Sequence, residues 1–402
     1  MKILFINTGP WGTGSFTVIH SLTDVFLKDH HQVKVFFPDN KLPTLEERLK
    51  YNDQRYITWK FPIEKNSVKI ASFPLMVPDP NPRSREDPIL FSKLTQKQLQ
   101  LYFKSLKNTL QSVIDTFKPD IIDTQHIWSN GYAIHELGHP YFVTAHNSDQ
   151  MAFLHDERMQ PYAKAIAKNA LSIFCATEYL KEKVCNLYQI DPSKIYITPN
   201  GYDQEIFYPY TVDKHQLLNR LSVKIPSNAT IVTCIGKVSK TKGIDILLKA
   251  NQYLSDNDNI HFILFGAGNV DQFVKDNQLP ISCLKNMHFV GHQTSKIIAQ
   301  ANNIAKLSVL PSRNEGFPLA ILEAMGCGLP MVVSDCCGLD KLAVGESFPI
   351  MHPEMLAKAI KKIIKLPKLA YQKLSKEAIK KATQYQWKKI AERRLAIYKK
   401  FL

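Results

Sequence analysis

Short apolar runs alternate with helical patterns along the first half of the chain. The run at 2–7 (KILFIN) leads into a glycine-bearing turn at 7–15 and a helical pattern, and a second apolar run follows at 33–37 (VKVFF). Two strands joined by a helix form a βαβ unit, which implies a parallel sheet. By the same criteria the next elements are strands at 121–123, 141–144, 173–176 and 195–198, with an amphipathic helix at 94–117. The segment 40–88 holds several prolines and predicts no clear element.

A second series of strands begins near residue 230, after the turn-rich stretch 199–209 (PNGYDQEIFYP). Its predicted strands are 231–236, 260–266, 287–291, 307–311 and 330–335. We therefore predict an α/β protein of two Rossmann-like, doubly wound domains, 1–205 and 206–384, that face each other across a cleft. Ligands bind such sheets at the carboxyl ends of the strands. The terminal helix at 385–402 carries an apolar stripe, and periodicity alone does not say which domain it covers.

Length and composition agree with two soluble domains. A chain of 402 residues exceeds the roughly 250–300 residues at which single cores stop growing. The apolar start is shorter than the roughly 7–15 residues of a signal-peptide core, and no run approaches the roughly 18 apolar residues of a membrane span. The seven cysteines include no CxxC pair and are expected to be reduced. These features predict a cytoplasmic protein.

Positive charge is concentrated near the end of the chain. The formal net charge is +15, and residues 353–402 hold 13 Lys and 2 Arg against 3 Glu. A basic face can attract nucleic acid, anionic lipid or phosphorylated substrates. The alternative is that these lysines form a solvated helical surface.

The stretch 313–335 (RNEGFPLAILEAMGCGLPMVVSD) holds the most specific candidate chemistry. Glu315 lies in a predicted loop after a strand, and Glu323 lies in a predicted helix that Pro318 begins. Backbone N–H groups at such a helix start favour anionic or hydroxyl-rich ligands. Two carboxylates there can bind the vicinal hydroxyls of a ribose and a sugar. Alternatively, Glu315 caps the helix and Glu323 faces solvent.

This stretch resembles the retaining GT-B glycosyltransferases of family 4, and the resemblance extends over most of the chain. It includes the glycine turn near residue 12, 143-VTAHN-147, 198-TPNGYDQEIF-207 and 235-IGKVSKTKGIDILLKA-250. The resemblance implies an acceptor-binding N-terminal domain, onto which the terminal helix crosses back, and a C-terminal domain that binds a nucleotide-sugar.

The resemblance also implies site residues. Glu323 would bind the nucleotide ribose, and Lys237 and Lys242 would neutralise the diphosphate, whose charge grows as the glycosidic bond breaks. Glu315 would contact the donor sugar and diphosphate together with backbone amides, and His146 would face the donor sugar. The contacting amides would be those of Gly316, Phe317 and Leu319, with Pro318 between them as a further substrate-binding position, and the glycine loop that allows close approach contains Gly12 and Gly14.

Three positions depart from the family pattern. Lys237 stands where arginine is usual, so a point charge replaces a bidentate fork. The N-terminal loop reads Gly-Thr-Gly where adjacent glycines are common, and Cys337-Gly338 replaces a pair of glycines. These departures affect individual donor contacts rather than the class of enzyme.

Three other functions are alternatives to this one. The sequence 135-HELGH-139 matches a zinc-protease motif, but Gly138 and Pro140 disfavour one continuous helix. The glycines at 9, 12 and 14 with Asp39 suggest an NAD-dependent oxidoreductase, yet their spacing is not G-x-G-x-x-G. A basic, non-catalytic binding protein for membrane or nucleic acid remains the third alternative, although a base-stacking surface is absent. His126 and His292 follow strands and are structural residues or site residues.

The resemblance therefore implies a retaining hexosyltransferase that needs neither a metal ion nor a cofactor. Its expected donor is a UDP-sugar, and its expected acceptor is a hydroxyl of a bacterial surface glycan or lipid-linked precursor. Basic charge and the apolar residues of 70–78 (IASFPLMVP) suggest docking on the inner face of an anionic membrane, and nucleic acid is not expected as a partner.

Overall fold

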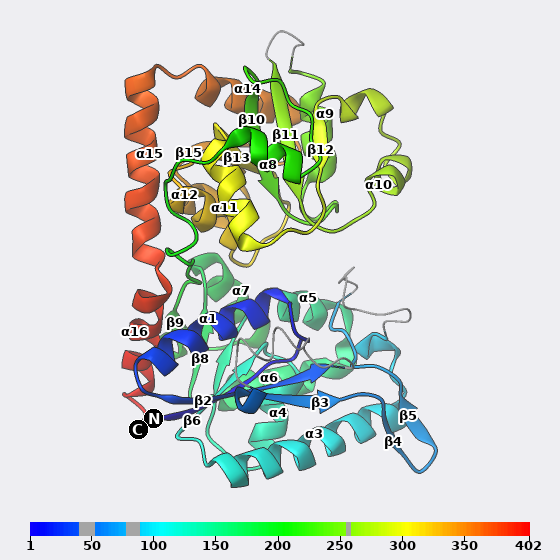
Figure 1. Cartoon of the computed structure of the whole chain (residues 1–402). Helices are drawn as coiled ribbons and strands as arrows, with labels where there is room; N and C mark the ends of the chain where they lie inside the picture. The colour runs from blue at the N-terminus through cyan, green and yellow to red at the C-terminus, as the bar shows by residue number, and fades with distance from the viewer. Residues whose placement is uncertain (40–52, 78–88, 255–258) are drawn as a thin grey trace. The chain divides into compact units, whose positions relative to one another are not determined.

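The computed structural model describes residues 1–39, 53–77, 89–254 and 259–402. The chain forms two compact units, Met1–Asn200 with Trp387–Leu402, and Gly201–Gln386. Each unit is built on a parallel sheet with helices on both faces (Figure 1). The predicted α/β class and its two Rossmann-like domains are confirmed.

The first unit contains a seven-stranded parallel sheet. Its strand order is β3-β2-β1-β6-β7-β8-β9, so the order reverses between β1 and β6. The strands are β1 (Lys2–Ile6), β2 (Gln32–Asp39), β3 (Tyr56–Lys60), β6 (Ile121–Gln125), β7 (Phe142–Thr144), β8 (Ser172–Cys175) and β9 (Ile195–Ile197). β4 (Ile63–Lys65) and β5 (Val68–Ile70) form a separate antiparallel pair. The predicted strands are all present, while β3 to β5 lie in the segment that predicted no elements.

Helices cover both faces of this sheet because successive strand residues point to opposite faces. Leu4 and Ile6 belong to the core under α3 (Gln96–Phe117) and α4 (Ser129–Glu136), whereas Phe5 stacks on Phe26 of α1 (Gly14–Lys28). The remaining helices in the described part of this unit are α5 (Ser148–His155), α6 (Gln160–Asn169), α7 (Glu178–Tyr188) and α16 (Trp387–Tyr398). A capping box fixes the start of α3, where Thr95 and Gln98 exchange hydrogen bonds.

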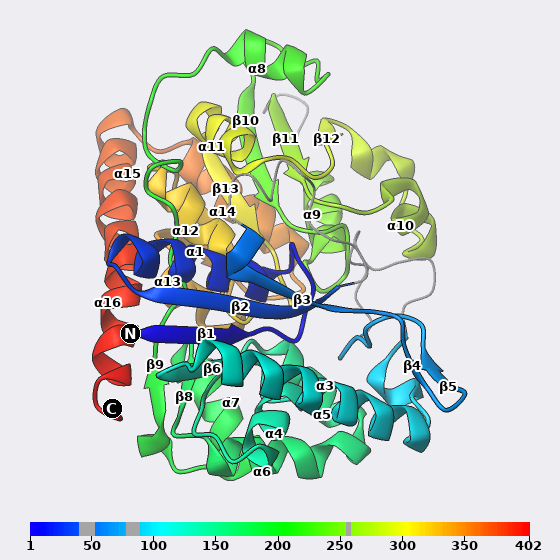
Figure 2. The ribbon, with the colours of Figure 1, turned by 60° about the horizontal axis from the view of Figure 1, so that its bottom comes forward.

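The last helix, α16, belongs to the first unit. It packs beside α1, and the two views agree on this placement (Figures 1 and 2). Trp387, Ile390, Leu395 and Tyr398 are buried, as the apolar stripe predicted. The helix begins at Trp387, because Gln386 has an extended backbone that separates it from the preceding helical turn.

The second unit contains a six-stranded parallel sheet in the order β12-β11-β10-β13-β14-β15, which reverses between β10 and β13. The strands are β10 (Thr230–Ile235), β11 (Ile260–Phe265), β12 (Met287–Phe289), β13 (Leu307–Leu310), β14 (Met331–Ser334) and β15 (Gly345–Phe348). Five of these were predicted. β15 was missed because it is an edge strand of sequence GESF with a single large apolar residue.

Buried apolar clusters separate both faces of this sheet from its helices. Val232 and Phe262 point to the core that α9 (Ile244–Asn251) and α14 (Pro353–Ile364) complete, and Ile231 and Ile263 point to the opposite face. The other helices are α8 (Lys214–Arg220), α10 (Val270–Asp276), α11 (Ser295–Ile304), α12 (Leu319–Gly326), α13 (Leu339–Leu342) and α15 (Lys368–Ala382). None of the helices in the described ranges has the length and apolar character needed to cross a membrane.

Two segments that the sequence singled out can be placed in the structure. In the apolar segment 70–78, Ile70 and Phe73 are buried in the core of the first unit, Leu75, Met76 and Val77 are half-buried, and Pro78 lies outside the described residues. In the 135–139 motif, α4 ends at Glu136 and Gly138 adopts a left-handed φ of 76°. His135 and His139 therefore do not share one helix, as Gly138 and Pro140 predicted.

Candidate active site

The loops after β10 and β13 meet at the point where the strand order of the second unit reverses. Parallel α/β sheets bind ligands at this topological switch point. Gly243 allows the two loops to approach each other, since a Cβ on it would lie 1.8 Å from the carbonyl oxygen of Pro311. The Arg313 N–H donates to the Thr241 carbonyl at 2.8 Å, and the Arg313 guanidinium binds both Asp245 oxygens at 2.7 and 2.6 Å. These contacts hold the two loops together.

Lys242 and Glu315 form an ion pair at this junction. The Lys242 Nζ lies 2.7 Å from Glu315 Oε1 and 2.8 Å from Oε2, and the Ser312 hydroxyl donates to Oε1 at 2.6 Å. The Glu315 side chain is 6% exposed and that of Lys242 is 30% exposed. Glu315 therefore does not cap α12. The Lys242 side chain stays partly accessible, so that an anion can reach it.

Glu323 lies in the second turn of α12 and has no such partner. Its side chain is half-buried, and no described residue forms a hydrogen bond or ion pair with its carboxylate. Burial raises its pKa to about 7. The alternative that Glu323 is an ordinary solvent-facing helix residue does not fit this environment. A desolvated carboxylate without a partner can accept hydrogen bonds from a vicinal diol.

The start of α12 leaves backbone donors available. No side chain caps the helix, and Pro318 is its N-cap residue rather than its first helical residue. Within the described part of the chain, nothing accepts from the N–H groups of Gly316, Phe317 or Leu319. Such groups carry partial positive charge and bind anions. Pro318 itself has no N–H and contributes only shape.

Two further residues, Lys237 and Cys337, stand near this site, and a third candidate, His292, lies away from it. Lys237 opens the loop after β10, five residues before Lys242. The Cys337 thiol lies 3.5 Å from the Glu315 backbone nitrogen, where the family pattern has glycine. His292 is exposed in the loop after β12, at the sheet's far edge.

The first unit gathers polar residues at the switch point of its own sheet. Asn7, Thr8, Gln125 and Asn130 are buried there, and the Thr8 hydroxyl donates to the Gln125 carbonyl at 2.7 Å while accepting from Asn130 at 3.2 Å. Gly12 is exposed with a φ of 79°, a conformation that glycine adopts without strain. The exposed Gly14 begins α1, with open space where a side chain would stand.

His146 follows β7 in the same unit and is held on two sides. Its backbone N–H donates to Asp149 Oδ1 at 3.0 Å, and its Nε2 lies 2.8 Å from Gln125 Oε1. The ring packs on that of the buried His126 at 4.7 Å between centroids. Burial lowers the pKa of His146 well below its usual value, and the charges of His126 and Arg394 act in the same direction. The imidazole is therefore neutral near pH 7.

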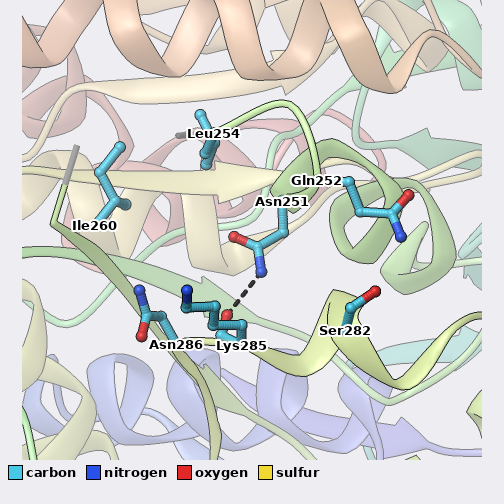
Figure 3. Close-up of a pocket in the computed structure, with 7 residues that line it drawn as sticks. All are labelled: Asn251, Gln252, Leu254, Ile260, Ser282, Lys285 and Asn286. Carbon is cyan, nitrogen blue, oxygen red and sulfur yellow. Dashed lines mark hydrogen bonds between the residues drawn. The ribbon is translucent and has the colours of Figure 1, made fainter. Parts of the chain in front are cut away.

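A separate pocket of about 280 Å³ lies at the opposite edge of the second sheet (Figure 3). Its lining residues are Asn251, Gln252, Leu254, Ile260, Ser282, Lys285 and Asn286. Ile260 begins β11 and Asn286 precedes β12, so the pocket stands at the amino ends of these strands. The Asn251 side chain bridges the Cys283 and Lys285 carbonyls at 3.1 and 2.7 Å. No candidate residue from the sequence lies in this pocket.

Some contacts at the two switch points were not foreseen from the sequence. The Lys242–Glu315 and Arg313–Asp245 pairs join residues 73 and 68 positions apart, and no local pattern indicates them. Gln125 did carry a signal, because it ends a strand in which Asp123 and Thr124 are also polar. Polar residues in a fully buried strand require partners.

Two family models and several curated proteins match this chain. The family model "Glycosyltransferase Family 4" matches residues 12–206, and "Glycosyl transferases group 1" matches residues 217–384. D-inositol 3-phosphate glycosyltransferase of Stackebrandtia nassauensis is 24% identical over 69% of this chain and 68% of its own length. UDP-Gal:alpha-D-GlcNAc-diphosphoundecaprenol alpha-1,3-galactosyltransferase of Escherichia coli is 32% identical over 45% of this chain, which is 46% of that protein.

The fold is shared over the full length with a solved structure. HepE of Anabaena, crystallised with UDP and glucose, superposes with a TM-score of 0.75 at 16% identity, covering all of both chains. The predicted GT-B fold is confirmed, and neither the dehydrogenase nor the non-catalytic alternative finds support. Two family models that together cover nearly the whole chain, and relatives that are themselves glycosyltransferases, establish its family. The chain belongs to glycosyltransferase family 4, among the glycosyl transferases of group 1.

Proposed function

We propose that this chain transfers a hexosyl group from a UDP-sugar to an acceptor hydroxyl with retention of configuration. The observation that carries the proposal is the constellation at the switch point of the second unit. There, the Lys242–Glu315 pair, the unpartnered Glu323 carboxylate and the uncapped start of α12 lie on neighbouring loops and one short helix. HepE of Anabaena, which shares the fold, was crystallised with UDP and glucose.

Each group has a chemical role in this proposal. Glu323 accepts from the two ribose hydroxyls of the nucleotide. Lys237, Lys242 and the amides of Gly316 and Leu319 stabilise the diphosphate, which gains negative charge as the bond to the sugar breaks. This stabilisation grows in the transition state and so lowers the barrier.

The remaining steps need no metal ion and no separate general base. The departing phosphate takes the proton of the acceptor hydroxyl on the same face from which it leaves, so that configuration is retained. Glu315 and His146 orient the sugar hydroxyls. Gly12 and Gly14 allow the donor and acceptor to approach the backbone of the first unit.

Calorimetric titration with UDP, GDP, ADP and NAD, with and without EDTA, tests the donor. We expect micromolar binding of UDP that EDTA leaves unchanged and that Glu323→Ala abolishes. Binding of GDP or ADP instead would keep the transferase and change its donor. NAD binding, or loss of UDP binding in EDTA, would contradict the proposal.

We also propose that the acceptor is a lipid-linked or polysaccharide precursor at the inner face of an anionic membrane. The relative from Escherichia coli acts, by its name, on a diphosphoundecaprenol-linked sugar. In α15, Lys368, Lys373, Lys376 and Lys380 are exposed, and the neighbouring Leu369 is 81% exposed. Co-sedimentation with phosphatidylglycerol vesicles at low salt is expected, and its absence there would remove the membrane part of the proposal.

A further inference from the structure

A chain of buried hydrogen bonds links the last helix to His146 within the first unit. Arg394 of α16 donates to Asp123 Oδ2 at 2.9 Å, and the Gln125 side-chain nitrogen donates to Asp123 Oδ1 at 2.8 Å. The Gln125 oxygen then faces His146 Nε2 at 2.8 Å. Asp123 and Gln125 are fully buried, and Arg394 is 2% exposed. No step of the proposed reaction uses Asp123, Gln125 or Arg394.

The donors and acceptors in this chain have a fixed direction. An ionised carboxylate only accepts, and Asp123 already accepts from Arg394 and from the hydroxyls of Thr144 and Tyr398. Gln125 must therefore turn its amide nitrogen towards Asp123 and its carbonyl oxygen towards His146. A carbonyl oxygen also only accepts, so the proton of the neutral imidazole has to be on Nε2.

The other ring nitrogen is then an acceptor. The charged or titratable groups around the ring are His126, Asp149 and Arg394, and Asp149 is engaged by the backbone N–H groups of Ile127 and His146. No described residue donates a hydrogen bond to His146 Nδ1. An unprotonated Nδ1 can accept from a hydroxyl group, and it cannot bind a phosphate oxygen that carries no proton.

We infer that Gln125 is a positioning residue that holds His146 in the Nε2–H tautomer, so that Nδ1 accepts a hydrogen bond from a hydroxyl of the donor sugar. The inference rests on the proposed function for the identity of that ligand. The tautomer itself is a property of the free protein and can be measured without substrate.

The test is the ¹⁵N spectrum of the full-length protein labelled at its 13 histidines. The pair of signals that is missing from the spectrum of the His146→Asn variant belongs to His146. We expect wild type to show a protonated Nε2 and an unprotonated Nδ1. Gln125→Met keeps the length of the side chain and removes its oxygen, so the signals should shift to a mixture of tautomers. Turnover should fall about tenfold, as expected for one hydrogen bond, while UDP affinity stays within about twofold.

Gln125→Glu provides the conservative comparison. Its carboxyl group must carry a proton that it donates to Asp123 Oδ1, because two ionised carboxylates repel each other at that distance, and its carbonyl oxygen still accepts from Nε2–H. The Nε2–H tautomer should therefore be kept. Gln100 is exposed on α3, and Gln100→Met and Gln100→Glu are the matched controls, expected to change neither spectrum nor rate.

The outcomes separate the inference from the function it rests on. A protonated Nδ1 in wild type, or an unchanged tautomer in Gln125→Met, would overturn the inference. If Gln125→Met does not fold, the wild-type spectrum and Gln125→Glu still decide it. The expected tautomer in a protein that transfers no hexose from any UDP-sugar would instead overturn the proposed function.

Discussion

Lys242 and Glu315 each supply the counter-ion that lowers the free-energy cost of burying the other's charge. Glu315 is nearly buried, and among the described residues the Ser312 hydroxyl is the one hydrogen-bond partner that its carboxylate keeps when the ammonium is removed. An uncompensated buried charge destabilises a fold by several kcal/mol, whereas removing both charges is often nearly neutral. The pair therefore couples stability to the proposed anion site. Mutations can separate its effect on stability from its effect on turnover.

Lys242→Met is expected to lower the free energy of unfolding by about 1–3 kcal/mol, because Glu315 loses its counter-ion. The double variant Lys242→Met/Glu315→Gln should recover at least half of that loss in urea unfolding. It should not recover turnover, since the diphosphate still lacks its cation. Recovery of both properties would show that the lysine acts only through the fold.

Glu323→Gln should stabilise the protein above pH 7. Burial raises the pKa of this carboxyl to about 7 in the folded protein. The protonated carboxyl is tolerated in the folded protein, so stability is highest below the ordinary glutamate pKa. Stability is lost as the pH rises through about 7, because the buried site disfavours the ionised carboxylate. The variant should gain on the order of 1–3 kcal/mol at pH 8 and little at pH 4.5.

Urea unfolding at the two pH values measures this difference, and the exposed Glu205→Gln is its matched control. An equal effect of Glu323→Gln at both pH values would contradict the assignment. UDP should bind wild type more tightly at pH 8 than at pH 6, since the ionised carboxylate is the better acceptor, and Glu323→Gln should remove this dependence.

The sequence identified single residues better than it identified their partners. Glu315 and Glu323 could be recognised because their spacing around a Gly-Phe-Pro turn is local. The pairing of Lys242 with Glu315 depends on the sheet order, which places β13 beside β10 although β11 and β12 intervene in the chain. Sequence periodicity predicts strands, but it does not order them.

At the scale of elements, α16 is attached to the sheet by one buried charge. Arg394 binds Asp123 and also donates to the hydroxyls of Thr144 and Thr198, at 3.0 and 3.2 Å. Its guanidinium lies over the Phe174 ring at 4.2 Å. The helix thus supplies the counter-ion for a carboxylate inside a strand, and its apolar stripe explains only part of its docking.

Arg394→Met is expected to cost about 3–5 kcal/mol in unfolding experiments, because Asp123 is left as a buried charge. The adjacent Arg393 is exposed, and Arg393→Met should stay within about 0.5 kcal/mol. Burial raises the pKa of Asp123 and Arg394 opposes that rise. Without Arg394 the carboxyl protonates more readily, so the deficit should be smaller at pH 5 than at pH 8.

The elements that the sequence missed are the ones with weak apolar patterns. β15 lies at a sheet edge and pairs with one strand, β14, and Phe348 is its one buried residue. β3 to β5 fall in a segment whose prolines and charges interrupt any period. The terminal helix was expected from residue 385, and one extended residue, Gln386, shortens it. Strongly periodic segments such as 94–117 were predicted within two residues of the observed helix.

At the scale of the whole molecule, the two units differ in how the chain builds them. Gly201–Gln386 is one continuous segment with its own cores, whereas the first unit joins Met1–Asn200 to Trp387–Leu402. A fragment of residues 201–386 should therefore unfold cooperatively on its own and retain UDP binding. Residues 1–200 should be markedly less stable than the same segment with a peptide of residues 387–402.

Thermal unfolding followed by circular dichroism measures both fragments. The Arg394→Met peptide is the control, and it should restore less stability than the wild-type peptide. Equal stability of residues 1–200 with and without the peptide would contradict the role assigned to α16. Domains of this size commonly fold alone, so the dependence on sixteen distant residues is a specific expectation.

The attachment of α16 also sets an order of events during synthesis. Asp123 and Arg394 are 271 positions apart, and a ribosome adds roughly 5–20 residues per second. For about 15–50 seconds the emerging chain therefore holds Asp123 without its guanidinium, while the second unit is translated and can already fold. The first unit to be made is thus the last to be finished, and nascent chains arrested before residue 394 should be bound by chaperones through their first half.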